Sequence, residues 1–142
     1  MRIDEEALWS AMGLVNGPEM FATFNLTDNW EWKQRTEGDS DQIALARDGS
    51  WTKTSVPTEI FKDLLEAGRI QDPRIDDNEK AVQWVGEVDW LYRTQFTIDT
   101  LPHDGEKAVL VFEGLDTFAS VYLNGTMILK AEVLLVLYGA LM

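Results

Sequence analysis

The sequence predicts an all-β, mainly antiparallel fold, arranged as an incomplete β-sandwich of jelly-roll type with one short helix. Short apolar runs with period-two alternation recur along the chain, as strands with one buried face require. The pair Asn124-Gly125 separates two of these runs, and Asn-Gly is a strong hairpin signal because both residues tolerate positive φ. The chain has 142 residues, of which 45% are apolar, so its length and composition suit one domain with a buried core.

The first strands are expected around two groups of tryptophans. Trp30 and Trp32 lie two residues apart, as a strand would place two side chains on one face. A second extended segment is expected to begin at Trp51 and to end at Val56-Pro57, because proline lacks an amide donor and holds the preceding residue extended. The charged stretch between them, TEGDSDQ, is typical of a solvated loop.

The one short helix is expected over about residues 59–67. Thr58 can cap its first turn, and Phe61, Leu64 and Leu65 recur at helical spacing. Gly68 is suited to the position after its last turn. The polar stretch that follows, RIQDPRIDDNEKAVQ, contains an Asp-Pro turn signal and is therefore interpreted as a loop.

The most aromatic strand is expected within VQWVGEVDWLYRTQF, residues 82–96. From residue 88 to residue 98, the even-numbered positions are apolar except for Thr94, namely Val88, Trp90, Tyr92, Phe96 and Ile98. Asp89 and Arg93 fall on the other side. Because alternation is what sheet packing demands, the aromatic side is interpreted as the lining of a sheet interior rather than as a binding site for a ring-shaped ligand.

The last strands surround the Asn-Gly pair. The run AVLVFEG is apolar on both of its faces, so it is expected to lie between other layers. FASVYLNGTMIL reads as a strand, a type I′ turn and a second strand. Glu113 and Asp116 flank Gly114-Leu115, and a buried glutamate there would accept hydrogen bonds from turn amides, a structural role that we favour over catalysis.

Charge and composition exclude several classes of partner. Twenty-five acidic residues oppose twelve basic ones, giving a net charge of −13, and the sequence contains no Lys/Arg cluster, so neither nucleic acid nor an anionic membrane is an expected partner. There is no cysteine, and His103 is the only histidine, so no metal site and no cofactor are expected. The start MRIDEEALWS lacks the order of a secretory signal, which predicts a cytoplasmic location.

Several segments in order resemble one family: Val56-Pro57, Ile70-Gln71-Asp72-Pro73, Asn78-Glu79, VQWVGEVDWLYRTQF, LVFEGLDTFASVYLNG and Ile128-Leu129. Together they resemble the N-terminal domain of the β-mannosidases of glycoside hydrolase family 2. Trp84-Val85-Gly86-Glu87 with Asp89-Trp90 favours the β-mannosidase branch over the β-galactosidases and β-glucuronidases. The resemblance implies a jelly roll of galactose-binding-like type over residues 24–132. Residues 1–23 show no clean period, so they are expected to form a poorly ordered leader.

In that family, a barrel domain carries two catalytic glutamates and hydrolyses terminal, non-reducing β-D-mannose with retention. The resemblance covers only the N-terminal domain and not the barrel. This chain is therefore expected to contain no catalytic residue and to be inactive alone. A β-mannoside glycan would be bound only through the missing domains. Residues 133–142, which contain the apolar run VLLVLYGALM, depart from the family. That run is too short to span a bilayer, which needs about 20 apolar residues.

Two alternatives remain open. The chain could be a stand-alone carbohydrate-binding module, with Trp84 as its sugar contact, or a gene-model fragment without a function of its own that associates with itself through unpaired edge strands. Glu87 and Asp89 are two apart, like a glycosidase pair, but they are interpreted as partners of Arg93 or of the loop. Residues expected to have structural roles are Trp90, Tyr92, Arg93, Glu113, Asp116, Asn124 and Gly125.

Overall fold

The computed structural model describes residues 24–44, 50–98, 108–115, 118–132 and 138–141. The chain divides into two compact units, one formed by Thr27–Phe96 and the other by Met1–Leu26 with Thr97–Met142. Each unit is described by itself. The leader over residues 1–23, His103 and Asp116 lie outside the described residues.

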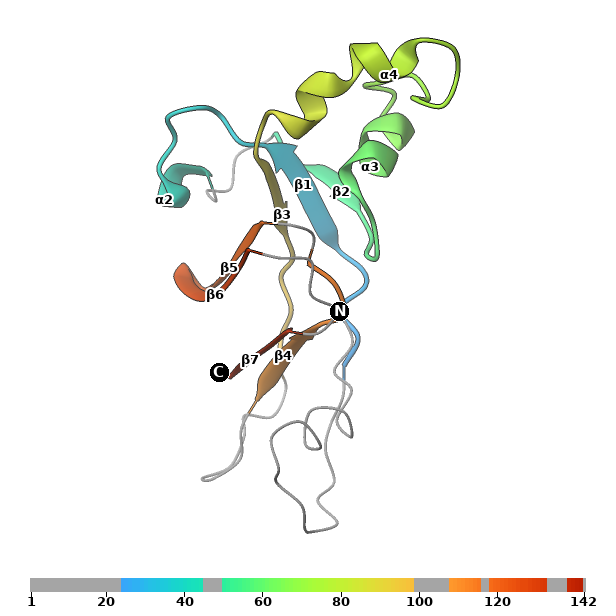
Figure 1. Cartoon of the computed structure of the whole chain (residues 1–142). Helices are drawn as coiled ribbons and strands as arrows, with labels where there is room; N and C mark the ends of the chain where they lie inside the picture. Colours follow the sequence, from blue (N-terminus) through green and yellow to red (C-terminus); the bar gives the residue numbers. More distant parts are fainter. Residues whose placement is uncertain (1–23, 45–49, 99–107, 116–117, 133–137, 142) are drawn as a thin grey trace. The chain divides into compact units, whose positions relative to one another are not determined.

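The unit Thr27–Phe96 is built on a three-stranded antiparallel sheet with the order β2-β1-β3 (Figure 1). Its strands are β1 (Trp30–Gln34), β2 (Thr52–Thr54) and β3 (Trp90–Arg93). Trp32 lies opposite Thr52 on one side and Tyr92 on the other, so these three residues share one face of the sheet. The strands predicted around Trp30, after Trp51 and around Trp90 are therefore confirmed.

The helical segments of this unit are α2 (Asp41–Ala44), α3 (Ile60–Glu66), α4 (Asn78–Ala81) and the 3₁₀ helix η1 (Gln83–Gly86). Of these, α3 and η1 cover the sheet face that carries Trp32. The predicted helix is confirmed as α3, and Gly68 follows it with a φ of +65°. The predicted cap is wrong, because Glu59 occupies the N-cap position and the Thr58 hydroxyl donates to the Asp63 side chain instead.

The interpretation of residues 69–88 as loop and strand needs correction. α4 and η1 occupy most of residues 78–86, and the strand begins only at Trp90. Val82 and Val85 lie three residues apart and are both buried. A helical turn brings residues at this spacing to one side, whereas the period-two pattern of a strand would place them on opposite faces.

The core of this unit consists of Trp32, Leu64, Val82 and Val85. Four half-buried side chains pack against it: Ile60, Ile70, Trp90 and Tyr92. The aromatic side of the β3 strand therefore lines the core. Leu64 from α3 and Val85 from η1 both lie on the sheet face of Trp32, which joins the helical segments to the sheet.

The second unit contains two antiparallel strand pairs. β4 (Val109–Phe112) pairs with β7 (Tyr138–Leu141), and β5 (Ala119–Leu123) pairs with β6 (Thr126–Ala131). The strand predicted in AVLVFEG is confirmed as β4, and both its successive residues Leu110 and Val111 are buried, as expected for a strand covered on two faces. β7 lies within the apolar run VLLVLYGALM, residues 133–142.

The Asn-Gly hairpin is confirmed. Asn124 and Gly125 have φ values of 50° and 82°, as a type I′ turn requires, and they join β5 to β6. A register shift lies between Val121 and Tyr122. The described strands pair antiparallel throughout, so the predicted all-β, mainly antiparallel class is confirmed, although the helical content exceeds the one short helix expected.

Candidate functional site

Three tryptophans from different elements meet on the covered face of the sheet. The ring centroids of Trp32 and Trp90 are 5.7 Å apart with an edge-to-face angle of 64°, and those of Trp84 and Trp90 are 5.9 Å apart. The indole N–H of Trp90 donates to the carbonyl of Val85 at 2.9 Å, so the one polar atom of that ring is satisfied. The Arg69 guanidinium lies 4.8 Å from the Trp32 centroid and covers it from the solvent side.

Trp84, the residue through which a sugar-binding module would contact its ligand, lies in η1 and not at the end of a strand. It is 37% exposed and leans on Trp90. Part of its ring is therefore open to a partner, and part belongs to the aromatic cluster. A role in sugar binding stays a prediction.

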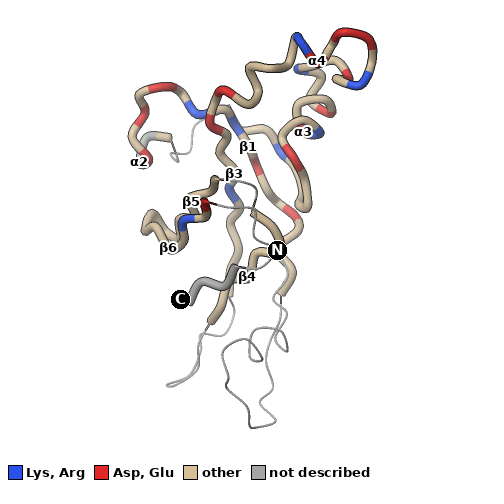
Figure 2. The backbone as a smooth tube through the Cα atoms, in the orientation of Figure 1, with Lys and Arg blue, Asp and Glu red and all other residues tan. Residues whose placement is uncertain are grey.

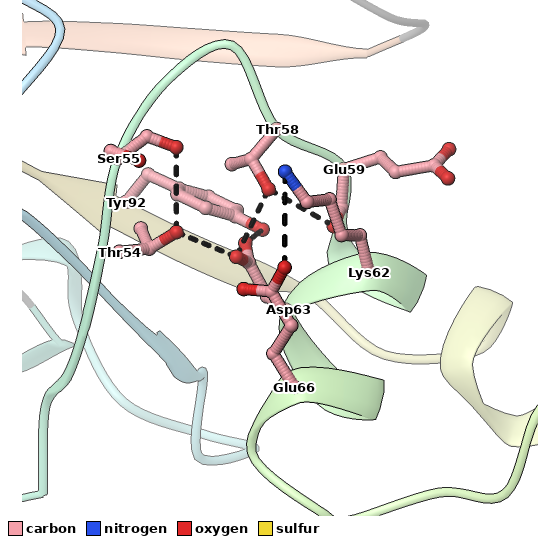
Figure 3. A network of polar contacts seen from close by, with 8 residues as sticks. All are labelled: Thr54, Ser55, Thr58, Glu59, Lys62, Asp63, Glu66 and Tyr92. Carbon is pink, nitrogen blue, oxygen red and sulfur yellow. Dashed lines mark hydrogen bonds and ion pairs between the residues drawn. The ribbon is translucent and has the colours of Figure 1, made fainter.

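Asp63 is the centre of a polar network that the sequence did not reveal. Asp63 is buried, with 2% of its surface exposed, and three hydroxyl groups donate hydrogen bonds to its carboxylate. The donors are Tyr92 at 2.6 Å, Thr54 at 2.6 Å and Thr58 at 3.0 Å. Figure 3 shows the three donors converging from β2, β3 and the segment before α3 onto the carboxyl group.

The location of Asp63 follows from helix geometry. It precedes the fully buried Leu64 and lies three residues after Ile60, next to the apolar stripe that α3 turns toward the sheet. Thr54 and Tyr92 project from the same sheet face as Trp32, because each lies opposite a β1 residue of that face. Nothing in the local pattern marks Asp63, because Thr54 and Tyr92 reach it only through the folded sheet.

The network changes the acid–base behaviour of Tyr92. Burial, together with the hydrogen bond and the charge of Asp63, raises the pKa of the Tyr92 hydroxyl well above its ordinary value. The phenol therefore remains protonated and acts as a hydrogen-bond donor to Asp63. This arrangement ties helix α3 to strands β2 and β3 and engages both carboxylate oxygens of Asp63.

The opposite face of the sheet carries a cluster of charged groups around Trp51. Arg93 donates from Nε and Nη2 to Glu31 at 3.0 and 2.8 Å, and its guanidinium carbon lies 3.8 Å from the Trp51 ring centroid. The ammonium of Lys33 lies 4.7 Å from the same centroid. The ion pair that the structure shows for Arg93 is therefore with Glu31, which lies directly opposite it in the sheet, rather than with the sequence neighbours Glu87 or Asp89.

The expectation for Glu113 is also wrong. Glu113 is exposed and comes directly after the last residue of β4, where the chain has left the paired strand. It is therefore not a buried acceptor for turn amides. Asn124 and Gly125 lie at the exposed tip of the β5–β6 hairpin and serve its turn geometry.

Acidic and basic residues are both spread along the described chain, with short acidic runs within residues 37–41 and 76–79 (Figure 2). Asp72 illustrates the local pairing: the hydrogen bonds from the Arg74 side chain and backbone lower the Asp72 pKa to about 2. Over the described ranges, no group of three or more acidic or histidine side chains is placed to hold a metal ion. The described helices also include none that is long and apolar enough to cross a membrane.

The features around Trp32 and Asp63 define a β domain in which aromatic and polar side chains hold a helical layer against a sheet. Comparison with known proteins gives the family. The family described as glycosyl hydrolase 2 galactose-binding domain-like matches residues 30–136. The chain belongs to this family.

Its relatives are β-mannosidases. β-Mannosidase B of Thermothelomyces thermophilus is 44% identical over 107 residues, which are 75% of this chain and 12% of that protein. β-Mannosidase B of Emericella nidulans is 35% identical over 113 residues, again 12% of that protein. The crystal structure of a β-D-mannosidase from Dictyoglomus thermophilum superposes with a TM-score of 0.64 at 32% identity, covering 82% of this chain and 13% of that one. The chain thus spans about an eighth of the length of its relatives.

Proposed function

We propose that this chain serves as the non-catalytic N-terminal domain of a β-mannosidase, and that its role is to fold as a rigid unit against the remaining domains of such an enzyme. The observation that carries the proposal is the 44% identity to a β-mannosidase B, confined to 12% of that protein's length. The reaction of the whole enzyme is then the retaining hydrolysis of terminal, non-reducing β-D-mannose.

The chemistry of the described residues supports a structural role. Asp63 is the most deeply buried acid of the described chain, and three hydroxyl donors hold it inside the fold. A general acid or base must reach a substrate with a free acceptor or proton. Asp63 instead accepts hydrogen bonds from Thr54, Thr58 and Tyr92, which is consistent with a structural role.

The test has two arms. The purified 142-residue chain is expected to release no p-nitrophenol from p-nitrophenyl β-D-mannoside, and turnover by this chain alone contradicts the proposal. In the second arm, the 107 matched residues of this chain replace their counterparts in the Thermothelomyces thermophilus enzyme. The chimera is expected to fold and to hydrolyse the same substrate, and a folded chimera without activity also contradicts the proposal.

A second candidate function is that of a carbohydrate-binding module, and the partial exposure of Trp84 beside Trp90 favours it. Aromatic faces stack on pyranose rings, so mannobiose would quench tryptophan fluorescence and raise the melting temperature of the chain. Trp84→Ala would abolish both responses, whereas Trp30→Ala, on β1, would leave them in place. A parent chain without any response to mannobiose excludes this candidate.

A further inference from the structure

Strand β7 fills one edge of strand β4. The two strands pair antiparallel, with Val109 opposite Leu141 at one end and Phe112 opposite Tyr138 at the other, so every residue of β4 has a partner in β7 (Figure 1). Among the described strands, β4 pairs with β7 alone. We call the edge of β4 that faces β7 the acceptor edge.

The acceptor edge belongs to a buried strand. Leu110 and Val111 are 5% and 0% exposed, and successive residues of a strand point to opposite faces, so both faces of β4 are covered. Water has little access to the backbone groups of such a strand, and a buried amide or carbonyl without a partner is costly. An empty acceptor edge would therefore destabilise β4, and a strand that pairs with it removes this cost.

The acceptor edge and the strand that fills it differ in their relation to the family. β4 lies within residues 30–136, which the family model matches, whereas β7 lies beyond them. β7 also contacts β6, so it lies beside both strand pairs of the second unit. The chain thus supplies, from outside the matched residues, a strand for an edge inside them.

The composition of residues 133–142 suits the acceptor edge. Their sequence, VLLVLYGALM, contains no charged residue and no proline. Pairing with a buried strand then removes no charge from water, and every residue brings an amide donor. When an extended segment adds to a sheet edge, main-chain hydrogen bonds supply the affinity. The ligand class for this edge is therefore a short, uncharged, apolar segment in an extended conformation.

We infer that the acceptor edge is a binding site for such a segment, and that residues 138–141 of the chain itself occupy it. The inference goes beyond the proposed function, because it assigns a site on the second unit and a ligand that is a peptide rather than a sugar. The pairing uses backbone groups that any extended copy of the segment presents, so the site also accepts this segment from a separate peptide.

Hydrogen exchange of the full chain tests the inference. The double substitution Gly139→Pro with Ala140→Pro removes two consecutive amides, one of which points toward β4. Amides of residues 109–112 are expected to exchange about tenfold faster than in the parent, whereas those of residues 60–66 keep their rate. The matched control, Gly139→Thr with Ala140→Thr, keeps both amides and should exchange like the parent. Unchanged exchange of residues 109–112 in the proline variant overturns the inference.

A synthetic peptide of residues 133–142 with a short lysine tail then supplies the segment in trans. Added to the proline variant, this peptide is expected to restore the slow exchange of residues 109–112. The same peptide with the two prolines should have no effect. Failure of the unaltered peptide, or equal protection by both peptides, overturns the acceptor edge as a binding site.

A disulfide test decides the case in which the proline variant does not fold. The chain contains no cysteine, so an introduced pair has no competing thiol. Val111→Cys with Gly139→Cys joins residues that lie opposite each other, whereas Val111→Cys with Ala140→Cys is one residue out of register. With glutathione disulfide as the oxidant, the first pair is expected to form a disulfide within one chain and the second is not.

Equal disulfide yields in the two variants overturn the inference. A disulfide between two chains overturns it as well, because the occupant of the acceptor edge is then a second copy. None of these measurements assays the hydrolysis of a glycoside, so their failure leaves the proposed function standing.

Discussion

The sheet of β1, β2 and β3 and the β5–β6 hairpin differ in what holds them. The sheet owes its form to side chains distant in sequence: Leu64 and Val85 cover Trp32, and Tyr92 reaches Asp63 across 29 residues. The hairpin depends on two adjacent residues, Asn124 and Gly125, whose positive φ values turn the chain. The first region is stabilised by tertiary contacts and the second by local backbone preference.

This difference has an energetic side. The sheet region contains the fully buried Trp32 and Leu64, so apolar burial supplies most of its stability. In the hairpin, the described residues are half-buried or exposed apart from Ala131. Substitutions in the sheet region should therefore act through packing and hydrogen bonds, and those in the hairpin through turn geometry.

The largest expected effect is that of Leu64→Ala. Leu64 is fully buried against Trp32, and its truncation leaves a cavity in the core. The free energy of unfolding should fall by about 2–5 kcal/mol, measured by urea denaturation. The matched control Met127→Ala, at an exposed hairpin position, should change it by only about 0.5 kcal/mol. Similar losses for both variants contradict the contrast between the two regions.

The next effect in size is that of Asp63→Asn. The substitution keeps the volume of the side chain but removes one acceptor oxygen, so one of the three hydroxyl groups loses its partner. A buried polar group without a partner costs about 1–3 kcal/mol, and the free energy of unfolding should fall by that amount. A double-mutant cycle with Tyr92→Phe should show that the two losses do not add, since both residues belong to one network.

Additive losses in that cycle contradict the network. Asp77→Asn is the matched control, because the Asp77 carboxylate is largely exposed in its pair with Lys80. Exposed pairs contribute little to stability, so this control should leave the unfolding transition nearly unchanged.

The same distinction explains what the sequence could predict. β1, α3, β4 and the hairpin carry local signals, namely tryptophans two residues apart, helical spacing before Gly68, a doubly apolar run and an Asn-Gly pair. Asp63 carries no such signal, since an acid in a short helix normally faces solvent. Its burial depends on Thr54 and Tyr92, which only the folded sheet brings to it.

The corrections around β3 have a similar cause. Period-two alternation predicts a strand from Val88 onward, whereas β3 begins at Trp90, and Val82 and Val85 need a helical turn to reach the core together. Closeness in sequence predicts that Glu87 and Asp89 are partners of Arg93. Strand pairing places Glu31 opposite Arg93 instead, across 62 residues, and that register cannot be read from the local pattern.

A smaller effect is expected in the hairpin. Gly125→Ala places a Cβ on a residue with a φ of 82°, which should cost about 1–2 kcal/mol. Space is not the obstacle, because nothing lies within 4 Å of the added Cβ. Hydrogen exchange of residues 119–131 should accelerate while that of residues 60–66 remains unchanged. Gly86→Ala, at a glycine without positive φ and with nothing within 4 Å, is the matched control and should not affect the hairpin. Equal acceleration in both segments contradicts the independence of the two regions.

The smallest expected effect is confined to alkaline pH and sharpens the description of the Asp63 network. The pKa of Tyr92 is raised in the folded chain above its ordinary value of 10.0, by burial and by Asp63. Below pH 10.0 the phenol is protonated in both states, and the stability linked to this group is fully present. Above that pH the unfolded chain releases the proton first, so the unfolded state binds fewer protons and the free energy of unfolding falls as the pH rises.

Tyr92→Phe should remove this decline, whereas Tyr122→Phe, on the hairpin, should keep it. The measurement is urea unfolding at a series of pH values from 8 to about 11, and a parent chain whose stability stays level there contradicts the raised pKa of Tyr92.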